Sequence, residues 1–153
     1  MKGKEKDTGD ILSERPYRSF VFSVAIDNIT VAEFSEVTGL NGEVEVEERR
    51  EGGNNMFMEK FPKMTKYGNL VLKRGVTHSL DLYKWYDDVT KRIFKKHNVT
   101  VTLEETAPNG KKIKSWSIQN ALPVKWSSSD LNAQGNNILV ESIELVHEGI
   151  TVS

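Results

Sequence analysis

Alternation of apolar and polar residues in short segments constrains the fold of this chain more than any other feature of its sequence. The clearest case is residues 43–47, where valines alternate with glutamates, and residues 20–26 and 99–104 follow the same period of two. This period places successive side chains on opposite faces of a β-strand. We therefore expect strand 43–47 to bury its valines and to turn its glutamates to water.

Further strands are indicated by apolar and β-branched residues that lie between turn signals. We expect them at residues 31–39, 69–73, 112–119, 121–127 and 138–147. Pro123 indicates an edge position or a bulge, and Asn41-Gly42 predicts a tight turn. In the last strand the apolar side chains change face between Val140 and Ile143, which predicts a bulge or burial on both faces.

A single amphipathic helix is predicted after residue 79. Its apolar residues recur with helical spacing at Leu82, Trp85, Tyr86, Val89 and Ile93. Ser79 is the expected N-cap. The total is about eight strands and one helix without βαβ repeats, which predicts a mainly β protein, an antiparallel barrel or sandwich with the helix packed against it. We expect its interior to be filled by Phe20, Phe22, Val44, Val46, Val99, Val101 and Leu103.

Composition limits the class of protein. The chain has 153 residues, no cysteine and a net charge of −1. These values predict one domain held by packing alone, without disulfides or thiolate metal sites, and argue against binding of nucleic acid phosphates. We expect residues 1–16 to form a flexible arm and residues 17–153 one domain. The polar start and the short apolar runs predict neither a signal peptide nor a membrane span, and hence synthesis in the cytoplasm.

The sequence offers no recognisable catalytic constellation. The histidines, at 78, 97 and 147, lack metal-ligand spacing. No phosphate-binding loop and no nucleophile elbow is present. Glu43, Glu45 and Glu47 share one face of a strand, where a charged surface is a better explanation than a pair of catalytic carboxylates. We therefore expect no enzyme, no cofactor and no metal site.

Large apolar residues in an expected loop suggest assembly. Residues 51–67 begin with a Gly/Asn-rich run, which predicts irregular structure. Four apolar side chains then follow at Met56, Phe57, Met58 and Phe61. Such residues need a surface to cover them, either the protein's own body or a neighbouring copy. We favour the neighbouring copy.

Four segments carry a resemblance to a known family. Residues 34–40 read Phe-Ser-Glu-Val-Thr-Gly-Leu, and residues 63–77 contain Lys-Tyr-Gly-Asn-Leu-Val-Leu-Lys-Arg-Gly. Residues 82–85 read Leu-Tyr-Lys-Trp, and residues 17–22 read Tyr-Arg-Ser-Phe-Val-Phe. Together they resemble the tube proteins of contractile tails, which include phage tail tubes and the inner tubes of extracellular injection systems and pyocin-like particles. The Hcp protein of type VI secretion is similar to this family more distantly.

The resemblance implies a fold and a role. The fold is an antiparallel two-sheet β-barrel with one flanking helix, and the role is that of a structural subunit. Its hexameric rings stack into a hollow tube inside a contractile sheath, and an extended loop, here residues 48–67, reaches the next ring. The implied partners are copies of the chain itself, sheath, baseplate or spike hub and terminator proteins, and protein cargo. The implied place is a phage tail-like particle assembled in the bacterial cytoplasm and released from the cell. We expect Glu43, Glu45 and Glu47 to face the lumen.

Alternative functions remain open at the level of sequence. The chain could be a tube-initiating subunit beside the baseplate, with the same fold. It could also be a free-standing small β-barrel that carries a ligand, provided that its interior has room. A secreted effector enzyme is disfavoured by the missing catalytic residues.

Overall fold

The computed structural model describes residues 20–27, 29–32, 34–50, 52, 58–106, 110–135 and 138–153. The expected arm, residues 1–16, lies outside these residues. The described part is mainly β with one helix, as predicted, and its strands pair antiparallel. The elements are β1 (Phe20–Ile26), β2 (Ile29–Ala32), β3 (Glu36–Thr38), β4 (Gly42–Arg49), β5 (Glu59–Tyr67), β6 (Leu70–Gly75), α2 (Asp81–Thr90), β7 (His97–Glu105), β8 (Lys112–Ser128), β9 (Val140–Val146) and β10 (Gly149–Val152).

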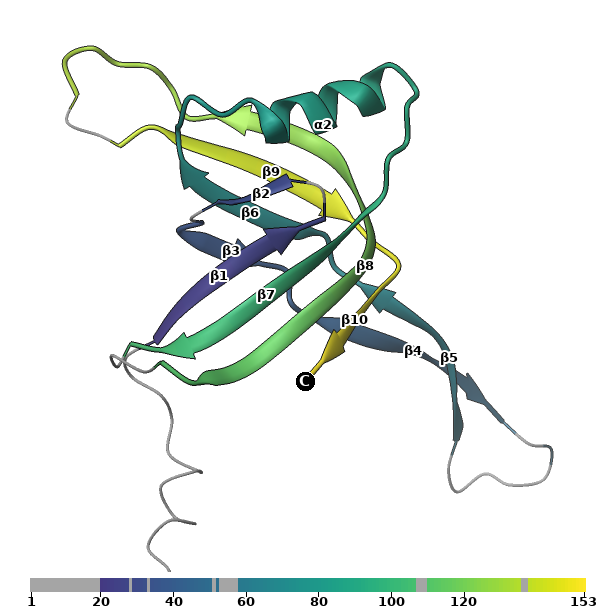
Figure 1. The fold of residues 1–153 in the computed structure, drawn as a ribbon. Coiled ribbons are helices and arrows are strands. Elements are labelled where there is room, and N and C mark those ends of the chain that lie inside the picture. The colour runs from purple at the N-terminus through teal and green to yellow at the C-terminus, as the bar shows by residue number, and fades with distance from the viewer. Residues whose placement is uncertain are drawn as a thin grey trace, which may run out of the picture.

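Strand β8 joins the two halves of the main sheet. It runs for 17 residues. Its first half pairs with β7 and β10, and its second half pairs with β9. The order of strands is β2-β1-β7-β8-β9-β6-β3, with β10 beside β8 (Figure 1). Two strands were expected at 112–127, and they are one strand with a register shift between Pro123 and Lys125, which confirms the irregularity predicted at the proline.

The two halves of this sheet enclose one hydrophobic core. Val99, Val101 and Ile118 come from the half that contains β7, and Leu72 and Ile143 come from the half that contains β6. All of them are at most 2% exposed. Each set alternates with exposed or half-exposed residues along its strand, so the period-two pattern describes the core-facing positions correctly.

Glu141 explains why the apolar residues of β9 change face. No bulge interrupts the pairing of β9 with β6, and the outer-face residues of β9 are half-buried or exposed, so neither the predicted bulge nor burial on both faces is found. Glu141, Ile143 and Leu145 point inward in strict alternation, and Val140 is on the outer face. A buried carboxylate stands where the pattern requires an apolar residue, because Arg74 lies opposite it and forms an ion pair with it.

Helix α2 lies across one end of the molecule and packs against β8 (Figure 1). Leu82 and Trp85 are its buried residues. The helix begins one residue later than predicted, with Leu80 as N-cap, although the Ser79 hydroxyl accepts a bond of 3.4 Å from the Asp81 amide. Ile93 lies beyond the last turn and is 45% exposed, so it is not part of the buried helix face.

A closed barrel is not found in the described part of the chain. The expected strand at 31–39 is two short strands, β2 and β3, at opposite ends of the strand order. Asn41-Gly42 does not make a hairpin turn, because β3 pairs with β6 and β4 pairs with β5. Three of the residues that we expect in the barrel interior lie at the surface instead. Phe20, Val44 and Val46 are 49%, 46% and 55% exposed.

Candidate assembly surface

Strands β4 and β5 form a two-stranded sheet of their own. The hairpin extends away from the body, at the end opposite to α2 (Figure 1). Residues 59–67 therefore form a strand and not the predicted irregular loop. The error has a physical cause, because Pro62 and a register shift between the pairs Val44–Thr65 and Val46–Pro62 interrupt the alternation of β5. Two residues of β5, Lys63 and Met64, lie opposite the single Glu45, which is the arrangement of a β-bulge.

One face of the hairpin carries an uncovered apolar patch beside the pair Glu48–Lys60. Val44 and Val46 lie on it with their partners Thr65 and Pro62, and both valines are about half exposed. The expected alternation is thus correct, but the valines are not buried within the chain. An isolated two-stranded sheet is at best marginally stable in water. A hairpin with such a face needs a further surface to cover it.

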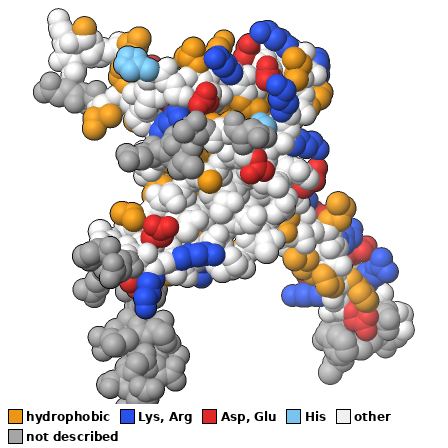
Figure 2. Space-filling view, in the orientation of Figure 1, with side chains coloured by type: hydrophobic (Ala, Val, Ile, Leu, Met, Phe, Trp, Pro, Cys, Tyr) orange, Lys and Arg blue, Asp and Glu red, His pale blue; other side chains and the backbone are white. Residues whose placement is uncertain are grey.

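The opposite face is charged and internally paired. Glu45 forms an ion pair with Lys66, and Glu47 lies 3.1 Å from the Arg49 guanidinium and 3.8 Å from the Lys63 amine. The hydrogen bond and charge of Lys66 lower the pKa of Glu45, and the same contacts raise the pKa of Lys66. Red, blue and orange side chains accordingly lie close together on the hairpin, at the lower right of Figure 2. The row of glutamates is therefore balanced by cations.

The predicted loop residues divide between the hairpin and the part of the chain outside the described residues, where Met56 and Phe57 lie. Met58 directly precedes β5 and is 43% exposed. Phe61 is the partner of Glu47, which places it on the charged face, and the Arg49 guanidinium lies 5.3 Å from the centre of its ring. Val44 and Val46 were not singled out as assembly residues, although their alternation with glutamates at residues 43–47 was a usable signal.

Close backbone contacts fix the base of the hairpin. Gly39 has a φ of +93°, and a Cβ on it would lie 2.0 Å from the carbonyl oxygen of Asn69, so only glycine fits there. The Asn41 side-chain oxygen accepts a bond of 3.1 Å from the Gly68 amide. These contacts join the segment that enters the hairpin to the segment that leaves it.

His147 holds the same base from the side of β9. Its Nε2 lies 3.0 Å from the carbonyl oxygen of Gly68, and since a carbonyl only accepts, Nε2 carries the proton. The ring packs against Tyr67 at a centroid distance of 5.6 Å. The contacts of Gly39, Asn41 and His147 therefore fix the position of the hairpin base on the body.

Two edge strands carry no charge. In sequence β2 is Ile-Thr-Val-Ala and β10 is Gly-Ile-Thr-Val. Each pairs along one edge only within the described residues, β2 with β1 and β10 with β8. Monomeric proteins usually protect such edges with charges or proline, because an open edge is a template for pairing with another chain.

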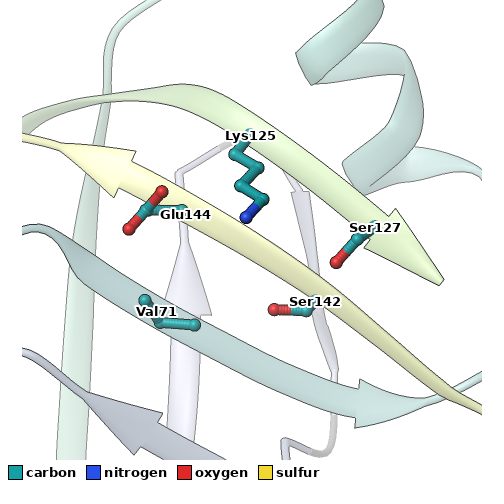
Figure 3. A pocket seen from close by; sticks show the side chains of 5 residues that line it. All are labelled: Val71, Lys125, Ser127, Ser142 and Glu144. Atoms are coloured by element: carbon teal, nitrogen blue, oxygen red, sulfur yellow. The ribbon is translucent and has the colours of Figure 1, made fainter. Parts of the chain in front are cut away.

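The outer face of β6, β8 and β9 bears a small hollow of about 110 Å³ (Figure 3). Val71, Lys125, Ser127, Ser142 and Glu144 line it. In the described structure neither serine hydroxyl bonds to the amine or the carboxylate, so no activated nucleophile is assembled. The described residues also contain no cluster of three or more potential metal ligands. None of the helical structure described is long and apolar enough to cross a membrane.

Comparison with known proteins decides the family. The family model "T4-like virus tail tube protein gp19" matches residues 18–151. The chain belongs to this tail tube family. No protein in the curated set matches it.

Solved structures agree with this membership. A chain in the baseplate structure of the anti-feeding prophage is 27% identical to this tail tube protein, with a TM-score of 0.72 over 91% of this chain and 95% of that one. A chain in a sheath–tube complex of the PVC extracellular contractile injection system is 24% identical, with a TM-score of 0.81 over 97% and 99%. Hcp1 from Flavobacterium johnsoniae is 16% identical, with a TM-score of 0.56 over 87% and 94%. The tail tube protein is a structural inner tube component.

Proposed function

We propose that this tail tube protein forms hexameric rings, and that the rings stack into the hollow inner tube of a contractile, phage tail-like injection particle. The observation that carries the proposal is the hairpin β4–β5, whose Val44 and Val46 are about half exposed in the described structure. Membership of the tail tube family supports it. So does the anti-feeding prophage baseplate, whose six-fold symmetrised structure contains a similar chain.

Within a ring, the open edges would pair. Strands β2 and β10 are both four residues long and uncharged, so β10 of one copy can add to β2 of the next and continue the sheet around the ring. The two-sheet barrel would then be completed between subunits. The subunits would close edges that the single chain leaves open.

Between rings, the hairpin would dock. Its valine face would lie on the body of a copy in the next ring, together with Met58 and the predicted loop residues Met56 and Phe57. Phe61 lies against Arg49 on the charged face of the hairpin. It would therefore stabilise the hairpin itself and would not contact the copy in the next ring. A contact between unlike surfaces that does not close into a ring propagates as a filament, which is the geometry of a stack.

The charged face of the hairpin would turn to water. With the valines docked, Glu43, Glu45 and Glu47 would line the lumen, where paired charges keep the wall hydrated and limit adhesion of cargo. The tube does no chemistry in this account. A contracting sheath would drive it through the target envelope, with baseplate and terminator proteins at its ends and protein cargo inside.

Electron microscopy of the purified full chain tests the proposal. The unmodified protein should give rings and hollow rods. Val44→Ser/Val46→Ser should remove the apolar contact, and it should leave folded rings that stack poorly. Val124→Ser is the matched control, because Val124 is 44% exposed and lies outside the hairpin. Rods of normal length and number from the hairpin variant would contradict the proposal.

A second candidate is the tube-initiating subunit beside the baseplate. The match to a chain in a baseplate structure favours it, since that match has the higher identity, 27% against 24%. An initiator would form a single ring without extending into rods. The copy number per particle, measured by quantitative mass spectrometry, separates the two roles.

A further inference from the structure

The turn that follows α2 presents apolar and basic side chains at the surface. Residues 91–96 read Lys-Arg-Ile-Phe-Lys-Lys. Ile93 is 45% exposed and Phe94 is 54% exposed, and neither belongs to the hydrophobic core. Aromatic residues and arginine are enriched at protein interfaces. The composition of this turn is therefore typical of a contact surface.

The backbone of the turn is held by the end of the helix. The Arg92 amide donates to the Val89 carbonyl at 3.0 Å, and the Ile93 amide donates to the Asp88 carbonyl at 2.8 Å. These bonds form a Schellman cap, in which Arg92 takes the left-handed position with a φ of +63°. Glycine is the usual residue there, because it has no Cβ. An arginine at this position costs backbone free energy, which points to a use for its side chain.

The lysines of the turn are neutralised by acidic residues of their own chain, whereas Arg92 is not. The ion pairs are Lys91 with Asp87 at 2.7 Å, Lys95 with Asp88 at 3.6 Å and Lys96 with Glu148 at 2.9 Å. Arg92 takes part in no ion pair within the part of the chain that the structure describes. Its exposed guanidinium is therefore available to a second molecule.

The position of the turn agrees with the geometry of a stack. Helix α2 lies at the end of the molecule opposite to the hairpin (Figure 1). When identical copies stack along one axis, the hairpin end of one copy meets the α2 end of the next. Figure 2 shows apolar side chains among charged ones at the α2 end, at the upper right. We therefore expect the surface that receives the hairpin at this end.

The valine face of the hairpin offers groups that match the turn. Val44 and Val46 are about half exposed, and Glu48 follows on the same face, with Lys60 as its cross-strand partner. Among the described residues, Glu48 forms no ion pair. The hairpin thus carries two uncovered apolar side chains and a carboxylate, and the turn carries two uncovered apolar side chains and a guanidinium.

We propose that Arg92, Ile93 and Phe94 receive the hairpin of a copy in the next ring. Val44 and Val46 of one copy would pack on Ile93 and Phe94 of the other. The Glu48 carboxylate would accept hydrogen bonds from the Arg92 guanidinium. The apolar contact would supply the affinity, and the ion pair would set the register between rings. The inference rests on the proposed docking of the hairpin, and it goes further because it names the surface on which the hairpin docks.

Two single variants of the purified full chain test the apolar and the basic part of this surface. Arg92→Gly removes the guanidinium and keeps the cap, because glycine adopts this φ without strain. It should melt no lower than the unmodified protein and should stack at least about tenfold less, measured by sedimentation and electron microscopy. Phe94→Ser should likewise remain folded, because Phe94 is about half exposed, and should stack at least about tenfold less.

A charge exchange tests the ion pair itself. Arg92→Glu and Glu48→Arg should each stack at least about tenfold less, because each brings two like charges together across the contact. Arg92→Glu/Glu48→Arg should recover stacking, since the pair is restored in the opposite direction. Lys84→Glu is the matched control, because it makes the same change of charge on α2 outside the turn and should stack normally.

The outcomes separate this inference from the proposed function. Normal rods from Val44→Ser/Val46→Ser would contradict docking of the hairpin itself. If that variant fails to stack while Arg92→Gly and Phe94→Ser stack normally, the hairpin docks on another surface and the inference about the turn is wrong. Failure of the double charge exchange to recover stacking would overturn the pairing of Arg92 with Glu48.

Discussion

Arg74 and Glu141 are direct cross-strand partners on β6 and β9, and the Arg74 Nε lies 2.9 Å from the Glu141 Oε2. Both residues are buried, at 2% and 6% exposure. The indole of Trp126 donates to the other carboxylate oxygen at 2.9 Å, and the guanidinium lies 5.9 Å from the centre of the Phe34 ring. The pair therefore links three neighbouring strands to the segment before β3.

Removal of one partner from this pair should destabilise the domain strongly. Glu141→Ala leaves the Arg74 charge buried without a counter-charge, and we expect a loss of about 3–5 kcal/mol in the free energy of unfolding. Glu36→Ala is the control, because the Glu36–Lys73 pair is exposed, with N and O 3.6 Å apart, and should cost at most about 1 kcal/mol. Urea unfolding followed by tryptophan fluorescence measures both values. Equal losses in the two variants would show that the buried pair has no special role.

Gly39→Ala should disturb the base of the hairpin. The positive φ alone costs an alanine about 1–3 kcal/mol, and the contact with the Asn69 carbonyl adds to that. The matched change is Gly75→Ala, since a Cβ there would meet nothing within 4 Å. We expect Gly39→Ala, and not Gly75→Ala, to lower the melting temperature and to raise proteolysis within the hairpin. A Gly39→Ala protein as stable as the Gly75→Ala control would contradict this placement.

The hydrogen bonds that Glu148 accepts should stabilise the domain at neutral pH and lose this effect in acid. Lys96 and Asn120 donate to its carboxylate at 2.9 and 2.7 Å and hold its pKa below the ordinary 4.5. A depressed carboxyl pKa stabilises the fold above pH 4.5, and this stability is lost as the pH falls through the folded-state pKa. Glu148→Gln should therefore melt at a lower temperature than the unmodified protein at pH 7, and the difference should shrink as the pH falls below 4.5 through the folded-state pKa. A difference that is independent of pH would refute the assignment.

The glutamate row can be tested without disturbing the valines. Glu43→Gln/Glu45→Gln/Glu47→Gln keeps the shape of the strand and removes its negative charges, leaving Lys63, Lys66 and Arg49 without counter-charges. We expect tubes of normal length in which acidic cargo is retained more strongly, measured by co-sedimentation at low and at moderate salt. Unchanged cargo retention and solubility would argue against a place in the lumen.

Sequence patterns predicted the elements in which the period of apolar residues is uninterrupted. Residues 20–26 were placed with the bounds of β1, and the helix was placed to within a few residues, because period and burial agree there. Strand β5 was missed since Pro62 and the bulge at Met64 hide its period. The inward Glu141 was missed for another reason: a pattern of apolar residues cannot show a buried charge whose partner is 67 positions away.

The assembly surface was only partly predictable. Alternation correctly gave Val44 and Val46 one face, but period alone cannot tell a face covered by its own chain from one covered by another. The valines were therefore assigned to the interior, whereas they are exposed on the hairpin. Strand β10 was not foreseen, because four residues at the end of a chain carry little periodic signal.

The most direct test of the account is a helical reconstruction by electron cryomicroscopy of the assembly formed by the full chain. We expect hollow stacked hexamers in which Val44 and Val46 lie against a copy in the adjacent ring, while β10 of each subunit pairs with β2 of its neighbour. A particle that stays monomeric at high concentration, or a tube in which the valine face of the hairpin remains in solvent, would contradict the central claim.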